Sequence, residues 1–168
     1  MIIKKKVKSM NTNFCFEPIV DKDSKILILG SFPSVKSREV NFYYGNPQNR
    51  FWKVVEEFFN IKIGNDIESK KQFLKNYHIA LWDIVKATQI KGSSDLDLVK
   101  EEKQINEVEE LLKKYPNIQK VFCNGKASYD LTVKYFPKLD VNYLPSTSPA
   151  NVSFKKEIWF ENLKILKK

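Results

Sequence analysis

Few residues of this chain are of the kinds that most often hold metals or activate nucleophiles. The two cysteines, Cys15 and Cys123, form no CxxC pair, which excludes a zinc or iron–sulfur site built from cysteines of this chain alone. The one histidine, His78, precedes a predicted strand, so we expect a structural or surface role for it and exclude a Ser-His-Asp triad. We therefore expect chemistry that uses neither a histidine base nor a cysteine-rich metal site.

Motifs that bind nucleotide phosphates and segments that direct a chain to or across a membrane are also absent from the sequence. Neither GxxxxGK[ST] nor GxGxxG occurs, so nothing indicates a nucleoside triphosphate or dinucleotide site. The sequence also has no signal peptide and no apolar run of membrane length. We expect an intracellular, cytoplasmic protein in a reducing compartment.

What the sequence does contain is a basic excess and a sizeable apolar fraction. Lys and Arg number 29 against 20 Asp and Glu, for a formal net charge of +9, which suits a polyanionic partner such as nucleic acid. The alternative is that the lysines near the two termini only keep the protein in solution. An apolar fraction of 42% in 168 residues argues against disorder and fits one domain with a core.

The alternation of predicted strands and helices indicates the fold class. The continuous apolar run Ile26–Leu29 predicts a buried strand. Further strands are expected at 79–82, 120–123 and 141–144, helices at 49–60, 66–76, 103–115, 127–135 and 154–166, and long loops at 30–48 and 84–97. We predict a single α/β domain over residues 16–168, with three α-β-α layers and a central, mainly parallel four-stranded sheet. Residues 1–15 are predicted to form a flexible basic arm, and residues 16–19 to pack across the sheet edge.

Because parallel strands end at one edge of a sheet, the four segments that follow them should meet there. These segments read GSFPS, WDIV, CNGK and LPSTSPAN, and they supply amides, hydroxyls, aromatic rings and one carboxylate. Aromatic faces and amides suit a planar heterocycle, whereas hydroxyls, Lys126 and helix N-termini suit phosphates. The combination predicts a site for a nucleotide within a polymer.

The segments GSFPS, FYYGNPQNRFW, LWD, VFCNGKASY and LPSTSPAN, in this order, resemble the uracil-DNA glycosylase superfamily. The similarity is greatest to the DNA-deoxyinosine (hypoxanthine-DNA) glycosylase branch, with the mismatch-specific uracil/thymine-DNA glycosylases as the next relatives. The resemblance implies a monomeric, monofunctional DNA glycosylase of base excision repair. Such an enzyme flips a deaminated base, hypoxanthine or uracil, out of double- or single-stranded DNA and hydrolyses its N-glycosidic bond. The resemblance implies that it requires no metal and no cofactor. The alternatives are a mismatch-specific uracil/thymine glycosylase and a catalytically inactive DNA-binding protein on the same scaffold.

The resemblance also implies roles for single residues. In the mismatch-specific relatives an Asn of the first motif positions the attacking water, and Phe32 stands at the matching position here. We therefore expect the catalytic amide further along the loop, at Asn49 or, as a second choice, at Asn46. The competing roles are a helix N-cap for Asn49 and a turn residue for Asn46.

The remaining expected site residues divide between the base and the DNA backbone. Tyr44 should stack on the flipped base, with Ser31 and Phe32 in the same pocket, and base–aromatic stacking contributes ~1–3 kcal/mol. Asp83 should contact the base or polarise the water, with a structural hydrogen bond to the loop as the alternative. Expected DNA contacts are Ser34, Lys126, Ser146, Thr147, Ser148 and Asn151.

Two departures from the relatives affect the expected mechanism. Ala150 stands where they carry a Leu wedge, so either Asn151 fills the vacated stack or bases are extruded weakly. Weak extrusion would favour mismatched or single-stranded targets, whose bases are easier to unstack. No lysine stands at an expected attacking position, so we predict direct hydrolysis without a Schiff base.

Overall fold

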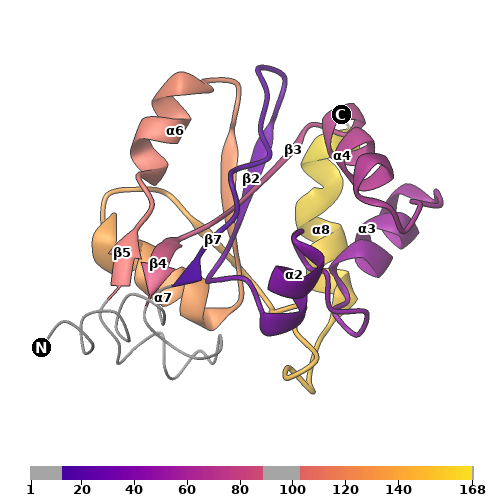
Figure 1. Ribbon diagram of the computed structural model, residues 1–168. Helices are drawn as coiled ribbons and strands as arrows, with labels where there is room; N and C mark the ends of the chain where they lie inside the picture. The colour runs from indigo at the N-terminus through magenta and orange to yellow at the C-terminus, as the bar shows by residue number, and fades with distance from the viewer. Residues whose placement is uncertain (1–12, 89–102, 168) are drawn as a thin grey trace, which may run out of the picture.

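The computed structural model describes residues 13–88 and 103–167, and at its centre a parallel sheet lies between two helical layers (Figure 1). The strand order is β3-β2-β6-β7, and each neighbouring pair is parallel. The strands are β2 (Ile26–Gly30), β3 (Ile79–Asp83), β6 (Lys120–Asn124) and β7 (Asn142–Leu144). The predicted α/β fold with a parallel four-stranded sheet is confirmed.

Strand β2 explains why its apolar run is continuous. It is paired on both sides, with β3 and with β6, and successive side chains of a strand point to opposite faces. Ile26 and Ile28 belong to one buried apolar cluster, and Leu27 and Leu29 belong to another. Both faces are therefore covered, and all four side chains are fully buried.

The helices form one layer on each face of the sheet (Figure 1). The first face is covered by α3 (Phe51–Phe59), α4 (Ile67–Asn76) and α8 (Lys156–Leu163), which a short 3₁₀ helix, η1 (Lys164–Lys167), follows. The second face is covered by α6 (Val108–Lys114) and α7 (Lys126–Tyr135). No helix within the two described ranges is long and apolar enough to cross a membrane.

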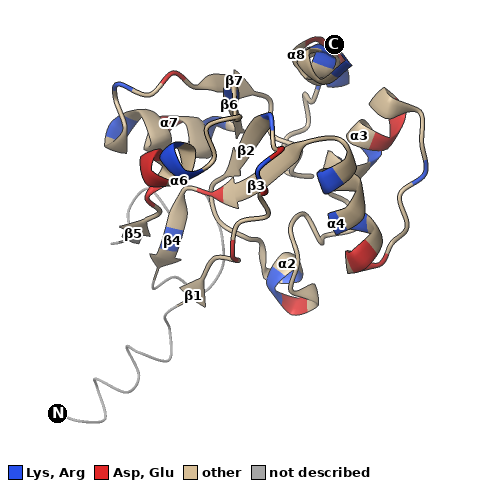
Figure 2. Cartoon of the chain, turned by 90° about the horizontal axis from the view of Figure 1, so that it is seen from above, with Lys and Arg blue, Asp and Glu red and all other residues tan. Residues whose placement is uncertain are grey.

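Lys and Arg residues occur on helices of both layers, with Asp and Glu residues interspersed among them (Figure 2). The ion pairs of the described residues are mostly local and solvent-exposed, such as Lys113 with Glu110 and Lys164 with Glu161. Such pairs contribute little to stability. The charges on the helices therefore do not by themselves point to one binding face.

Helix α2 (Val35–Val40) interrupts the segment that was predicted to be a loop over 30–48, so that prediction is wrong for these six residues. The Ser34 hydroxyl accepts a hydrogen bond from the Ser37 backbone N–H at 3.1 Å and caps the helix. Six residues are too few for an apolar period to stand out. Capping therefore marks this helix better than periodicity does.

A second sheet, antiparallel and ordered β1-β4-β5, was not expected from the sequence. Its strands are β1 (Asn13–Phe14), β4 (Val85–Thr88) and β5 (Lys103–Ile105). Residues 13–14 are therefore not part of a free arm, residues 85–88 are not loop, and the helix predicted from residue 103 begins only at Val108. Residues 1–12 of the predicted arm and 89–97 of the predicted loop lie outside the described residues. These strands pair across long sequence separations, which local periodicity does not reveal.

The free edge of β3 is covered by the segment that precedes β2, as predicted for residues 16–19. Ile19 and Leu81 form an antiparallel bridge, with both N–H···O distances at 2.9 Å. The Tyr43 hydroxyl also donates to the Glu17 carbonyl at 2.8 Å. An edge strand that is covered in this way does not expose its backbone groups for pairing with another chain.

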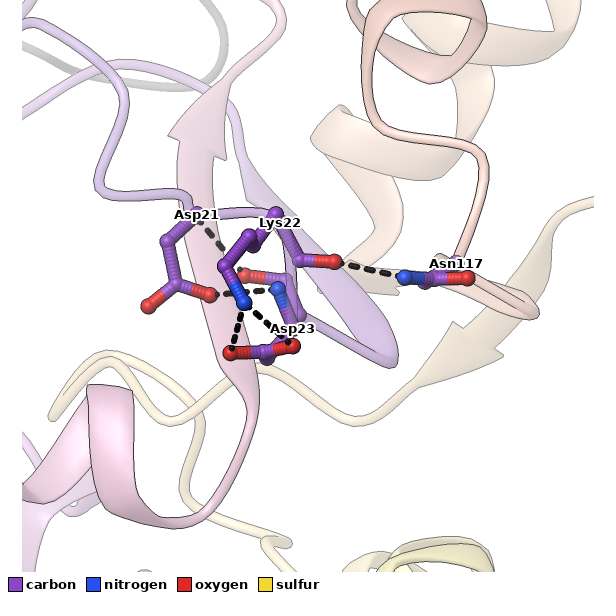
Figure 3. Close-up of polar contacts among 5 residues, drawn as sticks. Asp21, Lys22, Asp23 and Asn117 are labelled. Carbon is purple, nitrogen blue, oxygen red and sulfur yellow. Dashed lines mark hydrogen bonds and ion pairs between the residues drawn. The ribbon is translucent and has the colours of Figure 1, made fainter.

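At the opposite end of the sheet, a polar turn joins the starts of two strands (Figure 3). The Asp21 carboxylate accepts from the backbone N–H of Asp23 at 2.8 Å. The Asn117 amide, just before β6, donates to the Lys22 carbonyl at 2.7 Å. This end of the sheet is used for turns, which leaves the carboxyl end for a site.

Candidate active site

A cavity of about 390 Å³ lies at the carboxyl ends of β2, β3 and β6. A volume of this size falls in the range of small-molecule sites. Ten of the twelve residues expected at the site line it, namely Ser31, Phe32, Ser34, Tyr44, Asn46, Asn49, Asp83, Ser146, Thr147 and Ser148. The structure adds Phe16, Ser37, Tyr43 and Asn124 to the lining.

Three residues that we call the pocket floor, Gly30, Tyr44 and Asp83, converge at the end of β2. A Cβ atom added at Gly30 would collide with Oδ1 of Asp83 and would meet the Tyr44 hydroxyl at 3.4 Å. The glycine is thus required by the close approach of two polar side chains. Any larger residue at position 30 would displace one of them.

Asp83 is a buried carboxyl group that forms no ion pair with any described residue. It is 3% exposed, and its Oδ2 atom has no hydrogen-bond partner among the described residues. Burial raises its pKa from the ordinary value of 3.8 to about 7. The neighbouring Cys15, Tyr43 and Tyr44 also have raised pKa values, so they stay neutral and do not offset this effect. Near neutral pH the protonated and the ionised forms of Asp83 are therefore both populated.

Tyr44 lines the cavity in a strained backbone conformation. Its φ angle of 52° lies in the left-handed region, which is uncommon for a bulky residue and is found at functional sites. Its ring stacks on Phe51, with centroids 4.4 Å apart and planes at 26°. Its hydroxyl is buried and makes no hydrogen bond of good geometry among the described residues. Burial, aided by the nearby Asp83, raises its pKa, and the Asn124 amide beside the hydroxyl opposes this shift in part. Stacking of a base on Tyr44 stays a prediction.

Both candidate catalytic amides make local hydrogen bonds, although the N-cap of α3 is Arg50 and not Asn49. Oδ1 of Asn49 accepts from the Phe51 backbone N–H at 2.9 Å, at the start of α3. Oδ1 of Asn46 accepts from the Gln48 backbone N–H at 3.0 Å, in a turn. In each case the bond uses one lone pair of the oxygen and neither N–H of the amide group. Each bond also fixes the orientation of its amide beside the cavity.

The loop from residue 145 to 151, which we call the rim loop, is held by Asn124 at the end of β6. The Asn124 amide donates to the Thr147 hydroxyl at 2.9 Å and accepts from the Thr147 N–H at 3.0 Å. Arg50, just before α3, donates its backbone N–H to the Thr147 carbonyl and its Nη1 to the Ser148 carbonyl, both at 3.0 Å. Thr147 is fully buried. Its polar groups, which were expected to contact DNA, therefore serve to fix the loop.

The rest of the rim loop is bonded internally. The Ser146 hydroxyl accepts from the Ser148 N–H at 3.1 Å, and the Asn151 amide donates to the Ser146 carbonyl at 3.0 Å. Asn151 does not line the cavity and is committed to the loop. The neighbouring Val152 is 93% exposed and is the most exposed large apolar side chain described. Sequence reasoning missed Val152, although it lies two residues beyond Ala150.

Lys126 lies outside the cavity, at the first position of α7. Its ammonium group is exposed and pairs with Asp130 at 2.9 Å. Gly125 precedes it with a φ of 102°, and a Cβ there would approach Cβ of Ser146 to 2.9 Å. A glycine is thus needed for both the backbone conformation and the close packing against the rim loop.

No cluster of three or more His, Cys, Asp or Glu residues suited to a metal ion occurs in the part of the chain that the structure describes. The donors at the cavity are hydroxyls, amides and the single carboxyl group of Asp83.

Comparison with known proteins gives consistent results. The family model described as the uracil DNA glycosylase superfamily matches residues 17–165. A protein of Methanosarcina acetivorans named hypoxanthine DNA glycosylase is 36% identical over 151 residues, which cover 84% of this chain and 89% of that protein. A protein of Methanosarcina barkeri with the same name is 35% identical over 162 residues, which cover 89% of this chain and 96% of that protein.

A solved structure is similar along nearly the whole chain. It is a solution NMR structure from Methanosarcina acetivorans, described as a putative uracil DNA glycosylase. The TM-score is 0.76 at 31% sequence identity, and the match covers 94% of this chain and 99% of that one. The fold is therefore shared with it.

Proposed function

Because this chain belongs to the uracil DNA glycosylase superfamily, we propose that it is a monofunctional DNA glycosylase that removes deaminated bases, hypoxanthine first, in base excision repair. The observation that carries the proposal is the pocket floor beside Gly30, where the Tyr44 hydroxyl and Oδ2 of Asp83 are buried without a well-formed hydrogen bond to any described residue. A recognition site of this kind gives its polar groups a partner only when a ligand is bound.

The reaction is the hydrolysis of an N-glycosidic bond after the base is flipped out of the stack. Water attacks C1′ of the sugar, the bond from C1′ to the base breaks, and its electron pair leaves with the base. The proton that the water loses ends on the departing base. Neither a metal nor a cofactor takes part in this scheme, and no covalent enzyme intermediate forms.

Asn49 is our candidate for holding the water. Its Oδ1 is already fixed by the Phe51 N–H, so the amide is pre-oriented at the cavity before DNA binds. Pre-orientation of this kind lowers the cost of positioning a reactant. The local hydrogen bond to Phe51 and the catalytic role are thus compatible. Asn46 is the second candidate, because it also lines the cavity.

The DNA backbone would lie over the rim of the cavity. Ser34, Ser146 and Ser148 line that rim and can donate to phosphate oxygens, and Lys126 supplies charge beside it. We propose that Val152, rather than Asn151, enters the gap left by the flipped base, because Asn151 is bonded within the loop. We further propose that the enzyme acts as a monomer inside the cell, on double- or single-stranded DNA.

The proposal is tested by incubating the protein with duplexes that contain deoxyinosine or deoxyuridine and then treating them with alkali. Strand breaks should appear only after alkali, and borohydride should trap no covalent adduct. An Asn49→Ala variant should lose about 10²-fold or more in rate, and a smaller loss in Asn46→Ala would rank Asn49 above the second candidate. If Asn49→Ala retains full activity, the assignment of Asn49 is wrong.

One observation favours a second function. Phe32 is 7% exposed at the cavity wall, where the mismatch-specific relatives carry a polar residue, so loss of catalysis has a possible structural cause. Tight binding of lesion DNA without any alkali-sensitive breaks would then indicate a DNA-binding protein on this scaffold. Breaks in G·U and G·T duplexes, but not with deoxyinosine, would instead indicate a mismatch-specific enzyme.

A further inference from the structure

Arg38, in the last turn of α2, carries a positive charge that no acidic group of the described residues offsets. Nε and Nη2 of its guanidinium group are buried and have no hydrogen-bond partner among the described residues. The ion pairs there do not include Arg38, and burial lowers the pKa of its guanidinium group. A buried guanidinium group needs acceptors around it, because its lost hydration is otherwise uncompensated. The surroundings of Arg38 therefore lack an anion.

The two unpartnered nitrogens together form one edge of the guanidinium group. The N–H of Nε and one N–H of Nη2 lie in one plane and point in the same direction. Such an edge matches two oxygens of one phosphate or carboxylate, which accept both hydrogens at once. The unsatisfied pair therefore indicates a bidentate contact with an anion rather than a single bond to a neutral group.

Arg38 lies against the wall of the cavity. Its Cζ atom is 5.6 Å from the centroid of the Phe32 ring and lies over that ring, and Phe32 lines the cavity. The preceding residue, Ser37, also lines the cavity, and its hydroxyl accepts from the Gly45 N–H at 3.0 Å. This bond fixes α2 to the loop that borders the cavity. An anion bound to Arg38 would therefore lie beside a nucleotide that occupies the cavity.

We propose that the Nε/Nη2 edge of Arg38 binds a phosphate of the lesion strand, next to the nucleotide whose base enters the cavity. The proposal rests on the proposed glycosylase function, which brings a phosphodiester to this place. It assigns a backbone contact to a residue that was not among the expected DNA contacts. The side chain as a whole is half-buried, and rotation about its single bonds can turn the edge outward when a phosphate approaches.

The alternative is that Arg38 only packs on Phe32. A cation over an aromatic ring is stabilising by itself, and the last turn of a helix favours a positive charge. Neither interaction gives Nε and Nη2 an acceptor. Packing predicts that removal of the charge lowers the stability of the free protein, whereas an uncompensated buried charge predicts that it does not.

The test measures binding of a lesion duplex by fluorescence anisotropy at several salt concentrations. The deoxyinosine carries a 2′-fluorine, which destabilises a cationic transition state and so prevents excision during the measurement. Arg38→Met keeps a long side chain over Phe32 but has neither the charge nor the N–H groups. It should bind roughly 10- to 100-fold more weakly, and the slope of log K against log salt should fall by about 1. Its free energy of unfolding should equal or exceed that of the wild-type protein.

Neutral methylphosphonate linkages, placed one at a time around the lesion, locate the phosphate. At one linkage the replacement should weaken binding of the wild-type protein roughly 10-fold or more, but that of Arg38→Met about 2-fold or less. Arg38→Lys keeps the charge without the planar edge, so it should recover only part of the affinity. Lys36→Met is the matched control, because Lys36 is an exposed cation of the same helix. It should keep the full wild-type response to that linkage.

The inference is overturned if Arg38→Met weakens binding by the same factor whichever linkage is neutral, because the charge would then act without a particular phosphate. It is equally overturned if Arg38→Met lowers the free energy of unfolding and leaves binding unchanged, which would indicate packing on Phe32. Failure of the proposed function gives a different result. In that case the wild-type protein leaves no alkali-sensitive site in an unmodified deoxyinosine duplex, while the response to the one linkage persists.

Discussion

The pocket floor and the rim loop border the same cavity, but their polar groups differ in one respect. On the floor, the Tyr44 hydroxyl and Oδ2 of Asp83 are buried without partners among the described residues. In the rim loop, Thr147 is buried just as deeply, yet its hydroxyl, N–H and carbonyl are all bonded. The polar groups of the pocket floor are therefore available to bind a ligand, whereas those of the rim loop stabilise the loop conformation.

A rigid rim and an unsatisfied floor are complementary requirements for recognising one nucleotide. The rim must present its backbone to DNA in a fixed position, and bonds from Asn124 and Arg50 achieve this. The floor must exchange hydrogen bonds with the base, so its groups cannot be committed elsewhere. Three substitutions test this contrast between the two regions.

The largest effect is expected for Asp83→Asn on stability as a function of pH. The folded-state pKa of Asp83, about 7, lies above its ordinary value of 3.8, so the fold favours the protonated acid. The wild-type protein should lose stability as pH rises from about 4 through about 7, and an amide cannot do so. The free energy of unfolding of Asp83→Asn minus that of the wild-type protein should therefore increase by about 3 kcal/mol between about pH 4 and about pH 8.

Urea unfolding at the two pH values measures this difference. The same variant should be the slower enzyme, so the floor would combine lower stability with higher activity. An advantage that stays constant with pH would show that Asp83 has a partner that offsets its burial.

A smaller effect is expected for Thr147→Val in the rim loop. The variant keeps the shape of the side chain but leaves the Asn124 amide without its acceptor, which should cost ~1–2 kcal/mol of unfolding free energy. Thr147→Ser keeps the hydroxyl and is the control, and the difference between the two isolates the hydrogen bond. Thermal or urea unfolding measures both. If the Thr147→Val variant has the same unfolding free energy as the Thr147→Ser variant, the hydrogen bond to Asn124 does not stabilise the rim loop.

The smallest effect on stability is expected for Val152→Ser. The side chain is 93% exposed, so the unfolding free energy should change by less than about 0.5 kcal/mol. Excision from duplex DNA should fall by roughly 3- to 10-fold, because the gap left by the flipped base is no longer filled by an apolar group. Excision from single-stranded DNA should stay constant. Val133→Ala, on the exposed side of α7, serves as the control.

If Val152→Ser slows excision from single and double strands alike, Val152 does not act in base extrusion. A residue of the rim loop itself would then have to fill the gap left by the flipped base. Otherwise the result would support the alternative that bases are extruded weakly.

Much of the fold and the membership of the cavity could be predicted from local patterns. The apolar run of β2 predicted a strand buried on both faces, and the strand end at Asp83 placed that carboxyl group at the edge where the other segments meet. The antiparallel sheet could not be predicted, because β1 and β4 are joined by pairing between residues such as Asn13 and Thr88. Likewise, nothing in the order of residues showed that Asn151 is bonded to Ser146 while Val152 is exposed.

The sequence by itself determined the residue types that meet at the carboxyl edge, because the strand positions follow from apolar runs and the parallel polarity follows from their alternation with helices. Only the tertiary structure decided which polar groups would be satisfied. Asn124 and Thr147 lie 23 positions apart and bond to each other, whereas Tyr44 and Asp83 face each other across Gly30 without doing so. Hydrogen bonding depends on distance and angle between side chains, and these are set by packing rather than by position along the chain.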